Sequence, residues 1–256
     1  CHEALNCFEQ MRKEGCRPDA NTFICALKSC GSIGALDRGK QLHDEIMNKF
    51  LLNEDIALGN ALIDMYAKCG MLAQAQQLLE ELPDPQLVSW NALISGYAQH
   101  GHGHEAWNCL KQMQSEGHCP SVVTFVCILK ASGSVNGIDK GRQIHSMIVG
   151  TNFLENDVVL GNALVDMYVK CGVAAKAREV LEMLPVRDAI SWNTLISGYV
   201  QQAQSREALN SFKRMQYEDI SPNVVTFLCI LKACSIIGDI DKGKQIHYEI
   251  VKRSLL

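Results

Sequence analysis

The sequence predicts an all-α protein, a solenoid of stacked helix-turn-helix repeats. Apolar residues recur at helical spacing between short polar joints, strand alternation is never sustained, and only six of 256 residues are proline. The chain also matches itself at a shift of 102 residues, as in LGNALIDMYAKCG (58–70) and LGNALVDMYVKCG (160–172). Such repeats indicate a solenoid, because one helical hairpin cannot bury its apolar face alone.

Each 102-residue unit divides into sub-repeats of about 36, 31 and 35 residues, each long enough for two helices and their turns. The predicted register is 1–19 (partial), 20–55, 56–86, 87–121, 122–157, 158–188, 189–223 and 224–256 (incomplete). We expect the first helices to form an inner row and the second helices an outer row.

Apolar stripes support a helix pair in each type of sub-repeat. The first helix of 87–121 carries the stripe Trp90, Leu93, Ile94 and Tyr97. The stripes expected on second helices are Ala106, Leu110 and Met113 in 87–121, Ala75, Leu78, Leu79 and Leu82 in 56–86, and Gly39, Leu42, His43 and Ile46 in 20–55.

Composition excludes several classes of function. The hydrophobic content of 47% supports a large core, and the net charge of −4 gives no global attraction to nucleic acid or to an anionic membrane. Any site for a polyanion must therefore be local. No apolar run approaches the roughly 18 residues of a membrane-spanning helix, so no membrane partner is expected. The chain starts at Cys1 in mid-helix without a targeting segment, which suggests a piece of a longer protein.

The twelve cysteines follow the repeat and form no CxxC pair. Cys30, for example, recurs as Ser132 and Cys234. A small residue that tolerates serine is a packing choice, so we expect reduced, structural thiols rather than disulfides or a metal site.

An asparagine recurs at the fifth position of four sub-repeats. These residues are Asn60, Asn91, Asn162 and Asn193, whereas the same position of the 36-residue type holds Ile24, Val126 and Leu228. An amide can meet the Watson-Crick edge of an unpaired base. The alternative is that each asparagine caps its own helix, because asparagine is a favoured N-cap.

Several blocks resemble the plant-type pentatricopeptide repeat (PPR) family, whose P, L and S motifs have 35, 36 and 31 residues. VSWNALISGYAQ resembles a P motif, TFICALKSCGSIGALDRGKQLH an L motif and LGNALIDMYAKCG an S motif, and the match covers the whole chain. In register order, the sub-repeats are a partial P, then L, S, P, L, S, P and a partial L. The resemblance implies a right-handed α-solenoid that reads about one base per repeat.

The resemblance also implies that the fifth and last residues of a motif read one base together. The pairs are Asn60 with Gln86, Asn91 with Ser121, Asn162 with Asp188, and Asn193 with Asn223; Asp19 is half of a pair whose partner lies upstream. In the family these combinations favour pyrimidines, and the implied site is 5′-?-C-N-U-Y-3′. Asn60 with Gln86 departs from the usual combinations, which leaves its base open.

In the same family the second residue of each coding motif packs on the base face. Here those residues are Ala57, Val88, Val159 and Ile190, and alanine would be a poor clamp. The alternative is that all four are ordinary core aliphatics.

Phosphate contacts must come from local lysines, since the net charge is negative. The resemblance assigns them to Lys68 and Lys170, two turns beyond the S-motif asparagines. Lys28, Lys130 and Lys232 recur in L motifs, where a solvated flank is the simpler interpretation.

Two further motifs do not indicate catalysis or metal binding. GKQLH lacks the upstream glycine and the Ser or Thr of a phosphate loop, and His43 within it lies on an apolar stripe, which favours a packed, hydrogen-bonded histidine. HGHGH, at 100–104, is interpreted as a variable turn. A zinc deaminase needs HxE followed by PCxxC, and neither pattern occurs. We therefore expect no enzyme, no cofactor and no metal.

The sequence thus predicts a module for sequence-selective binding of single-stranded RNA, resembling the target-recognition array of an organelle C-to-U editing factor. The resemblance implies a mitochondrion or chloroplast, and multiple organellar RNA editing factors as protein partners through the L motifs. The alternative is a protein-interaction solenoid of the tetratricopeptide type. Those arrays keep a uniform 34-residue period, whereas this chain alternates three lengths.

Overall fold

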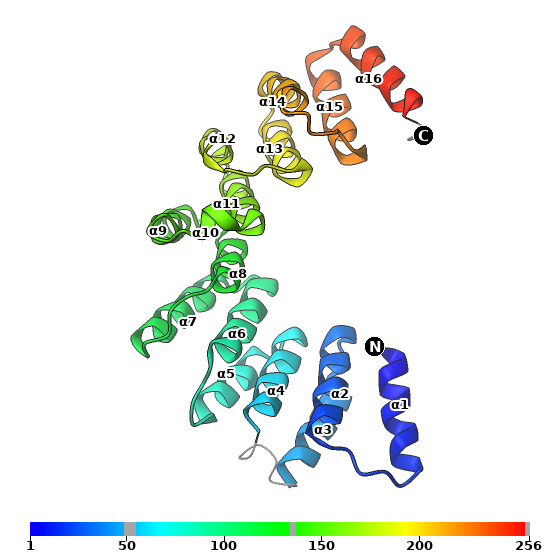
Figure 1. Cartoon of the computed structure of the whole chain (residues 1–256), viewed down its shortest axis with the longest axis vertical. Helices are drawn as coiled ribbons and strands as arrows, with labels where there is room; N and C mark the ends of the chain where they lie inside the picture. Colours follow the sequence, from blue (N-terminus) through cyan, green and yellow to red (C-terminus); the bar gives the residue numbers. More distant parts are fainter. Residues whose placement is uncertain (49–54, 134–136, 254–256) are drawn as a thin grey trace. The chain divides into compact units, whose positions relative to one another are not determined.

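The structure is a computed structural model that describes residues 1–48, 55–133 and 137–253. The chain forms two compact units, Cys1–Ala131 and Ser132–Leu256, which are described separately. All regular secondary structure of the described residues is helical (Figure 1), as the sequence predicts.

The first unit contains eight of the described helices, the last of which ends at the unit boundary. They are α1 (His2–Lys13), α2 (Ala20–Ile33), α3 (Leu36–Asn48), α4 (Ile56–Lys68), α5 (Leu72–Glu81), α6 (Leu87–Gln99), α7 (Gly103–Ser115) and α8 (Val122–Ser132). The second unit contains α9 (Ile138–Val149), α10 (Phe153–Asn156), α11 (Val158–Lys170), α12 (Ala174–Met183), α13 (Ala189–Gln201), α14 (Ser205–Tyr217), α15 (Val224–Ile237) and α16 (Ile240–Lys252).

The first helices of successive repeats pack against one another within each unit. Helices α2, α4 and α6 form such a row in the first unit, and α11, α13 and α15 form one in the second (Figure 1). Second helices pack against their own first helix and the next one, as α5 does with α4 and α6 in the first unit and α12 does with α11 and α13 in the second. Each unit is therefore a stack of helical hairpins, an α-solenoid with the two predicted rows.

Polar residues fix the start of the first helices. The side chains of Asp19, Asp157, Asp188 and Asn223 each accept a hydrogen bond from a backbone N–H in the first turn of the helix that follows. Such caps satisfy N–H groups that have no partner inside the helix. Every first helix begins at the first residue of a predicted repeat, while the naming of repeats as P, L or S stays a prediction. The short helix α10 is not anticipated by the sequence pattern.

The predicted stripes form the core. Trp90, Leu93, Ile94 and Tyr97 are buried, and so are the stripes of the second helices, apart from the half-buried His43 and Leu82. Burying one large aliphatic or aromatic side chain stabilises a fold by roughly 1.5 to 3 kcal/mol. The stacked hairpins therefore bury the apolar faces that a single hairpin would expose.

On the second helix of each complete 36-residue repeat, a glycine and a histidine contact the first helix of the next repeat. A Cβ at Gly39 would lie 2.4 Å from the sulfur of Met65, so any larger residue would displace the end of that side chain. Beside it, the imidazole Nδ1 of His43 and the hydroxyl of Tyr66 are hydrogen-bonded at 2.9 Å. The second unit repeats both features at Gly141 and at His145, which lies 2.8 Å from the Tyr168 hydroxyl.

Burial lowers the pKa of both histidines, mainly through desolvation. Their charged form is therefore disfavoured in the fold. The interpretation of His43 as a packed, hydrogen-bonded histidine is confirmed.

All twelve cysteines are free. Cys30, Cys109 and Cys234 are buried, and desolvation raises the pKa of Cys30 to about 11 and that of Cys109 to about 12. These are structural thiols, as expected. Cys7 and Cys25 are exposed, so the packing interpretation is wrong for these two members of the repeating set, whose side chains face away from the hairpin core.

Candidate nucleic-acid interface

The four fifth-position asparagines lie on α4, α6, α11 and α13, one turn after the helix start. In each case the side-chain oxygen accepts a hydrogen bond from a hydroxyl at the third position of the next first helix. The donors are Ser89 to Asn60, Thr124 to Asn91 (2.7 Å), Ser191 to Asn162, and Thr226 to Asn193 (2.6 Å). A residue of one repeat thus orients the amide of the repeat before it.

The hydroxyl that donates to asparagine also closes a helix cap. The Thr124 hydroxyl accepts from the backbone N–H of Ser121 at 3.0 Å, and the Thr226 hydroxyl accepts from that of Asn223 at 3.1 Å. These threonines are fully buried. Because a hydroxyl has one proton, and that proton goes to the asparagine oxygen, the amide nitrogen must point the other way.

The amide nitrogen points to the last residue of the same repeat in three of the four predicted pairs. The Nδ2 group of Asn91 donates to the Ser121 hydroxyl at 3.5 Å, that of Asn162 to the Asp188 carboxylate at 3.3 Å, and that of Asn193 to the Asn223 carbonyl at 3.0 Å. The structure therefore brings these residues together. Gln86 is exposed, and the oxygen of Asn60 is held by Ser89.

The alternative that each asparagine caps its own helix is wrong. The caps come from the residue before the helix, such as Asp188 for α13 and Asn223 for α15. The fifth-position side chains lie beyond the first turn and bond to groups 26 to 33 residues away. Asp19 is likewise a cap: it accepts from the backbone N–H of Thr22 at 2.8 Å, on the third-position residue of α2.

The Asp188 carboxylate is held in its ionised form. Desolvation raises its pKa, but hydrogen bonds from the backbone and hydroxyl of Ser191 and from Asn162 outweigh this, so that its pKa lies below the ordinary value of 3.8. At neutral pH this residue can accept hydrogen bonds and cannot donate one.

The second-position aliphatics are solvent-exposed and lie beside the asparagines. Val88, Val159 and Ile190 have exposed fractions of 61%, 64% and 61%, and Ala57 is also exposed. The alternative that they belong to the core is wrong, because residues three apart share a helix face and this face turns away from the hairpin interface. The small Ala57 leaves one position of the series without a large apolar side chain.

Each unit has a hollow lined by first helices. In the first unit Asn60 and Asn91 line a hollow of about 400 Å³ together with Ala57, Val88 and Val123. In the second unit Asn193 and Asn223 line a hollow of about 460 Å³ together with Ile190 and Val225. Amides alternate with exposed aliphatics along both surfaces.

The predicted phosphate ligands are already paired. Lys68 lies 2.7 Å from Asp64, and Lys170 lies 2.7 Å from Asp166, each one turn earlier on its own helix. These carboxylates offset the positive charge that a phosphate would meet. Lys28, interpreted from sequence as a solvated flank, is exposed and also lines the first hollow, which Asn60 shares.

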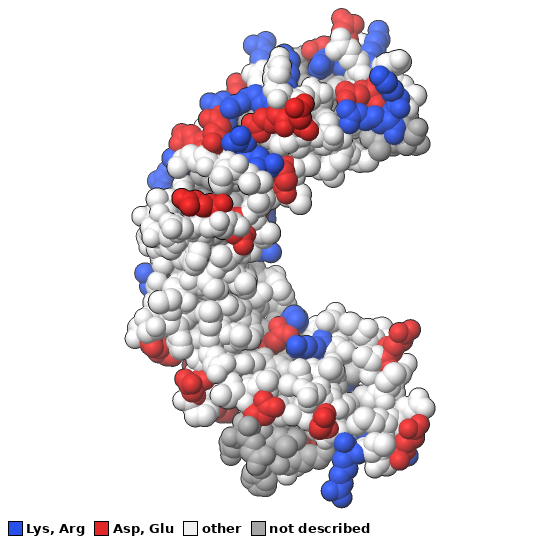
Figure 2. All heavy atoms as spheres, in the orientation of Figure 1, with Lys and Arg blue, Asp and Glu red and all other residues white. Residues whose placement is uncertain are grey.

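Charge does not gather into a single basic patch on the face shown in Figure 2, where acidic and basic side chains are interspersed within each unit. Among the described residues, no group of three or more His, Cys, Asp and Glu side chains is placed to hold a metal ion. Likewise, no helix in the described ranges has the length and apolarity to cross a membrane. Within HGHGH, His100 lies in the turn after α6, with its ring nitrogen 3.1 Å from the carbonyl of Ala67.

Comparison with known families matches the repeats. The PPR repeat family matches residues 85–133 and 187–235, and a second description, PPR repeat, matches 1–16 and 60–84. Together these matches cover more than half of the chain. The chain belongs to the PPR family.

Curated PPR relatives come from Arabidopsis thaliana. Pentatricopeptide repeat-containing protein At1g15510, chloroplastic, is 33% identical over 94% of this chain and 28% of its own length. The mitochondrial protein At3g09040 is 35% identical over 98% of this chain and 24% of its own length. The chain thus spans about a quarter of the length of these relatives.

A solved PPR protein has the same fold. The crystal structure of PPR10 in complex with an 18-nt psaJ RNA element has a TM-score of 0.51 and 18% identity, covering 100% of this chain and 48% of that one. This likeness supports the assignment of an α-solenoid.

Sequence reasoning missed the third-position hydroxyl. Thr22, Ser89, Thr124, Ser191 and Thr226 recur two residues before the fifth position and are invariably Ser or Thr in these five repeats. The contact joins different repeats, so helical periodicity alone could not reveal it.

Proposed function

We propose that this PPR chain binds single-stranded RNA and reads about one base with each S- and P-type repeat, with a preference for pyrimidines. The observation that carries the proposal is the fixed orientation of the fifth-position asparagine. Its oxygen is occupied by a hydroxyl of the next repeat, and one Nδ2 proton is directed to the last residue of its own repeat. The second Nδ2 proton is left to donate to a base.

The residue paired with asparagine then distinguishes the two pyrimidines. Uracil carries a donor at N3 and cytosine an acceptor, while both have an acceptor at O2. The ionised Asp188 can only accept, so the Asn162–Asp188 pair suits uracil. This agrees with the base implied by the family resemblance.

Ser121 has the opposite character. Its hydroxyl oxygen accepts from the backbone N–H of Thr124 at 3.3 Å and from the amide of Asn91 at 3.5 Å. Its proton goes to the Thr124 hydroxyl at 3.1 Å, because the Thr124 proton goes to Asn91. Turned toward the RNA instead, that proton would be a donor that suits N3 of cytosine. In the last pair, the Asn223 amide has both a donor and an acceptor, which suits either pyrimidine.

Apolar contacts complete the proposed site. Val88 and Val123 flank Asn91, and Ile190 and Val225 flank Asn193, so a base inserted between adjacent repeats would meet an aliphatic side chain on each face. The L-type repeats, with Ile24, Val126 and Leu228 at the fifth position, would contribute spacing. This yields the site 5′-?-C-N-U-Y-3′, with the base at Asn60 and Gln86 open.

We further propose that the chain is the target-recognition array of a C-to-U editing factor in a mitochondrion or chloroplast. Support comes from the alternation of repeat lengths and from the chloroplastic and mitochondrial names of the relatives. The array would act by binding, with deamination supplied elsewhere, and its L-type repeats would contact multiple organellar RNA editing factors.

Fluorescence anisotropy tests the RNA proposal. A labelled strand containing C-N-U-Y should bind, and a strand with purines at the same three positions should bind at least roughly tenfold more weakly, since each base contact contributes about 1 to 3 kcal/mol. Asn91→Ala should weaken binding mainly when its paired base is C. Equal titration curves for both strands would instead favour a protein-interaction solenoid.

A further inference from the structure

A lysine recurs at the ninth position of the three repeats of the 36-residue type, on their first helices. These residues are Lys28 on α2, Lys130 on α8 and Lys232 on α15, and all three are exposed. Each follows the aliphatic fifth position by four residues, so the two side chains share one face of the helix. The repeats that lack a fifth-position asparagine therefore carry a cation on the same face.

These ninth-position lysines are unpaired. The residues three and four positions away on either side are uncharged in all three cases, so no carboxylate of the same helix face competes for the ammonium group. The ion pairs among the described residues include none of the three lysines. Lys68 and Lys170 differ, because each lies 2.7 Å from an aspartate on its own helix. The ninth-position lysines are thus available to an external anion.

The hollow of the first unit includes both the fifth and the ninth positions of three successive repeats. Its lining contains Ile24 with Lys28, Asn60 with Asp64, and Asn91 with Ser95. A ninth-position residue lies about 6 Å farther along the helix than the fifth-position residue. A base that meets Asn60 or Asn91 therefore shares its hollow with Lys28.

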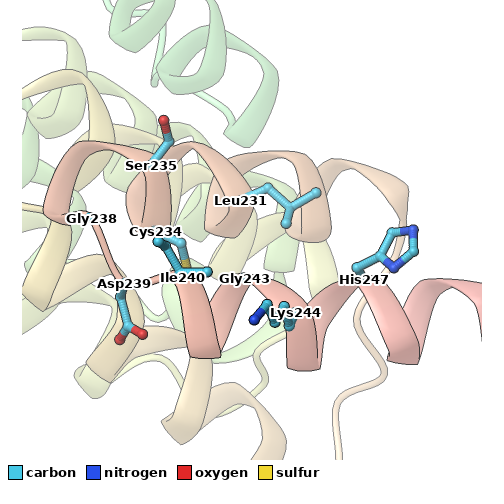
Figure 3. A pocket seen from close by; sticks show the side chains of 9 residues that line it. All are labelled: Leu231, Cys234, Ser235, Gly238, Asp239, Ile240, Gly243, Lys244 and His247. Carbon is cyan, nitrogen blue, oxygen red and sulfur yellow. The ribbon is translucent and has the colours of Figure 1, made fainter.

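The other two lysines lie on helix faces that line a hollow. Lys130 follows Val123 of α8 by seven residues, two helical turns, and Val123 lines the hollow of the first unit. Lys232 follows Val225 of α15 by the same spacing, and Val225 lines the hollow of the second unit. Cys234, on the opposite side of α15, instead lines a separate hollow with α16 (Figure 3).

We infer that the ninth-position lysines of the L-type repeats bind the phosphate backbone of the RNA, an inference that rests on the proposed function. A pyrimidine whose Watson–Crick edge meets a fifth-position amide directs its glycosidic nitrogen N1 away from that amide. Its ribose and phosphates then lie toward the open part of the hollow, where the lysines supply positive charge. In this arrangement the L-type repeats hold the strand and the S- and P-type repeats read it.

The ninth positions of the other repeats cannot replace these lysines. They are Asp64 and Asp166 in the S type, and Ser95 and Ser197 in the P type. A carboxylate repels a phosphate, and a serine carries no charge. Unpaired positive charge at this position recurs every 102 residues, which gives a chain of net charge −4 a local attraction to RNA.

The salt dependence of RNA binding tests the inference. Anisotropy titrations of the whole chain with a C-N-U-Y strand give the slope of log K against log salt concentration, to which each phosphate contact on a single strand contributes about 0.7. Lys28→Gln should reduce the slope by about 0.7, and the triple variant with Lys130→Gln and Lys232→Gln by about 2. Lys28→Arg should keep the parent slope. As a matched control, Lys213→Gln removes one exposed charge from the second helix α14 and should leave the slope nearly unchanged.

The lysines should hold the strand without reading it, because phosphate contacts carry no base information. The triple variant should therefore lose affinity by the same factor for the C-N-U-Y strand and for the purine-substituted strand. Its melting temperature should equal that of the parent chain, since the three side chains are exposed and unpaired.

An uncharged linkage locates one of the contacts. Lys130 belongs to the repeat 122–157, which the proposed register aligns with the base N of C-N-U-Y. When a methylphosphonate replaces one phosphate beside N, the parent chain should bind the strand several-fold more weakly. Lys130→Gln should bind the modified and unmodified strands equally, because the charge that meets this phosphate is already absent.

The inference is overturned if the parent chain binds RNA and the triple variant keeps the parent salt slope, or if Lys213→Gln lowers the slope as much as Lys28→Gln does. It is also overturned if the triple variant changes the preference between the two strands, because the lysines would then act in base selection. If the parent chain binds neither strand at low salt, the proposed function itself fails, and the inference fails with it.

Discussion

Replacing Thr124 by valine keeps the shape of the side chain and removes one buried hydroxyl. That hydroxyl donates to Asn91 at 2.7 Å and accepts from the backbone N–H of Ser121 at 3.0 Å. Each lost hydrogen bond costs about 1 kcal/mol, so the free energy of unfolding should fall by about 2 kcal/mol. Thr124→Ser keeps the hydroxyl and should cost much less, since Ser89 and Ser191 occupy the same position in other repeats.

The same variant should also change base selection. Without the hydroxyl the Asn91 amide is free to rotate, and its oxygen can then face the base in place of its nitrogen. Urea unfolding measures the first effect, and anisotropy titration with C, U, A or G at the paired position measures the second. We expect Thr124→Val to reduce discrimination at that base about tenfold. The orienting role is refuted if stability falls while discrimination is retained.

Three further outcomes follow from the structure. Ala203 has φ 56° where the equivalent position of the preceding P-type repeat has Gly101 at φ 78°, a left-handed conformation that glycine adopts more easily than alanine. Ala203→Gly should therefore raise the free energy of unfolding by about 1 kcal/mol, and Gly101→Ala should lower it by about the same amount. Changes of the same sign in both variants would contradict this. Burial lowers the pKa of His43 below 6.5, so this residue binds protons more readily in the unfolded chain than in the folded one. The free energy of unfolding should therefore decline as pH falls from about 7 to 5, and His43→Gln should make that decline less steep. Asp64→Asn should strengthen RNA binding and steepen its salt dependence by releasing Lys68, and an unchanged salt slope would exclude that lysine as a phosphate contact.

The fold could be predicted from sequence because its determinants are local. Helical spacing of residues such as Trp90 and Leu93, together with capping residues at repeat boundaries, specifies each hairpin without knowledge of its neighbours. The repeat then implies stacking. The contact of Gly39 with Met65 was not foreseen, because it depends on how closely two hairpins approach.

The candidate site was predicted in part. Sequence placed Asn91 with Ser121 and Asn162 with Asp188 through the family resemblance, and the structure brings each pair within hydrogen-bonding distance. The orienting hydroxyls were missed because they come from the next repeat. The pairing of Lys68 with Asp64 was readable from their i, i+4 spacing, yet the lysine was considered without its neighbour.

The most direct test of base reading exchanges two residues within one unit. Asp188 and Asn223 both cap a first helix and both pair with an asparagine, so the double variant Asp188→Asn with Asn223→Asp preserves the caps and the net charge. In competition between strands that differ only as C-N-U-C and C-N-C-U, the parent chain should prefer the first and the double variant the second. If both proteins prefer the same strand, the paired residues do not read the base.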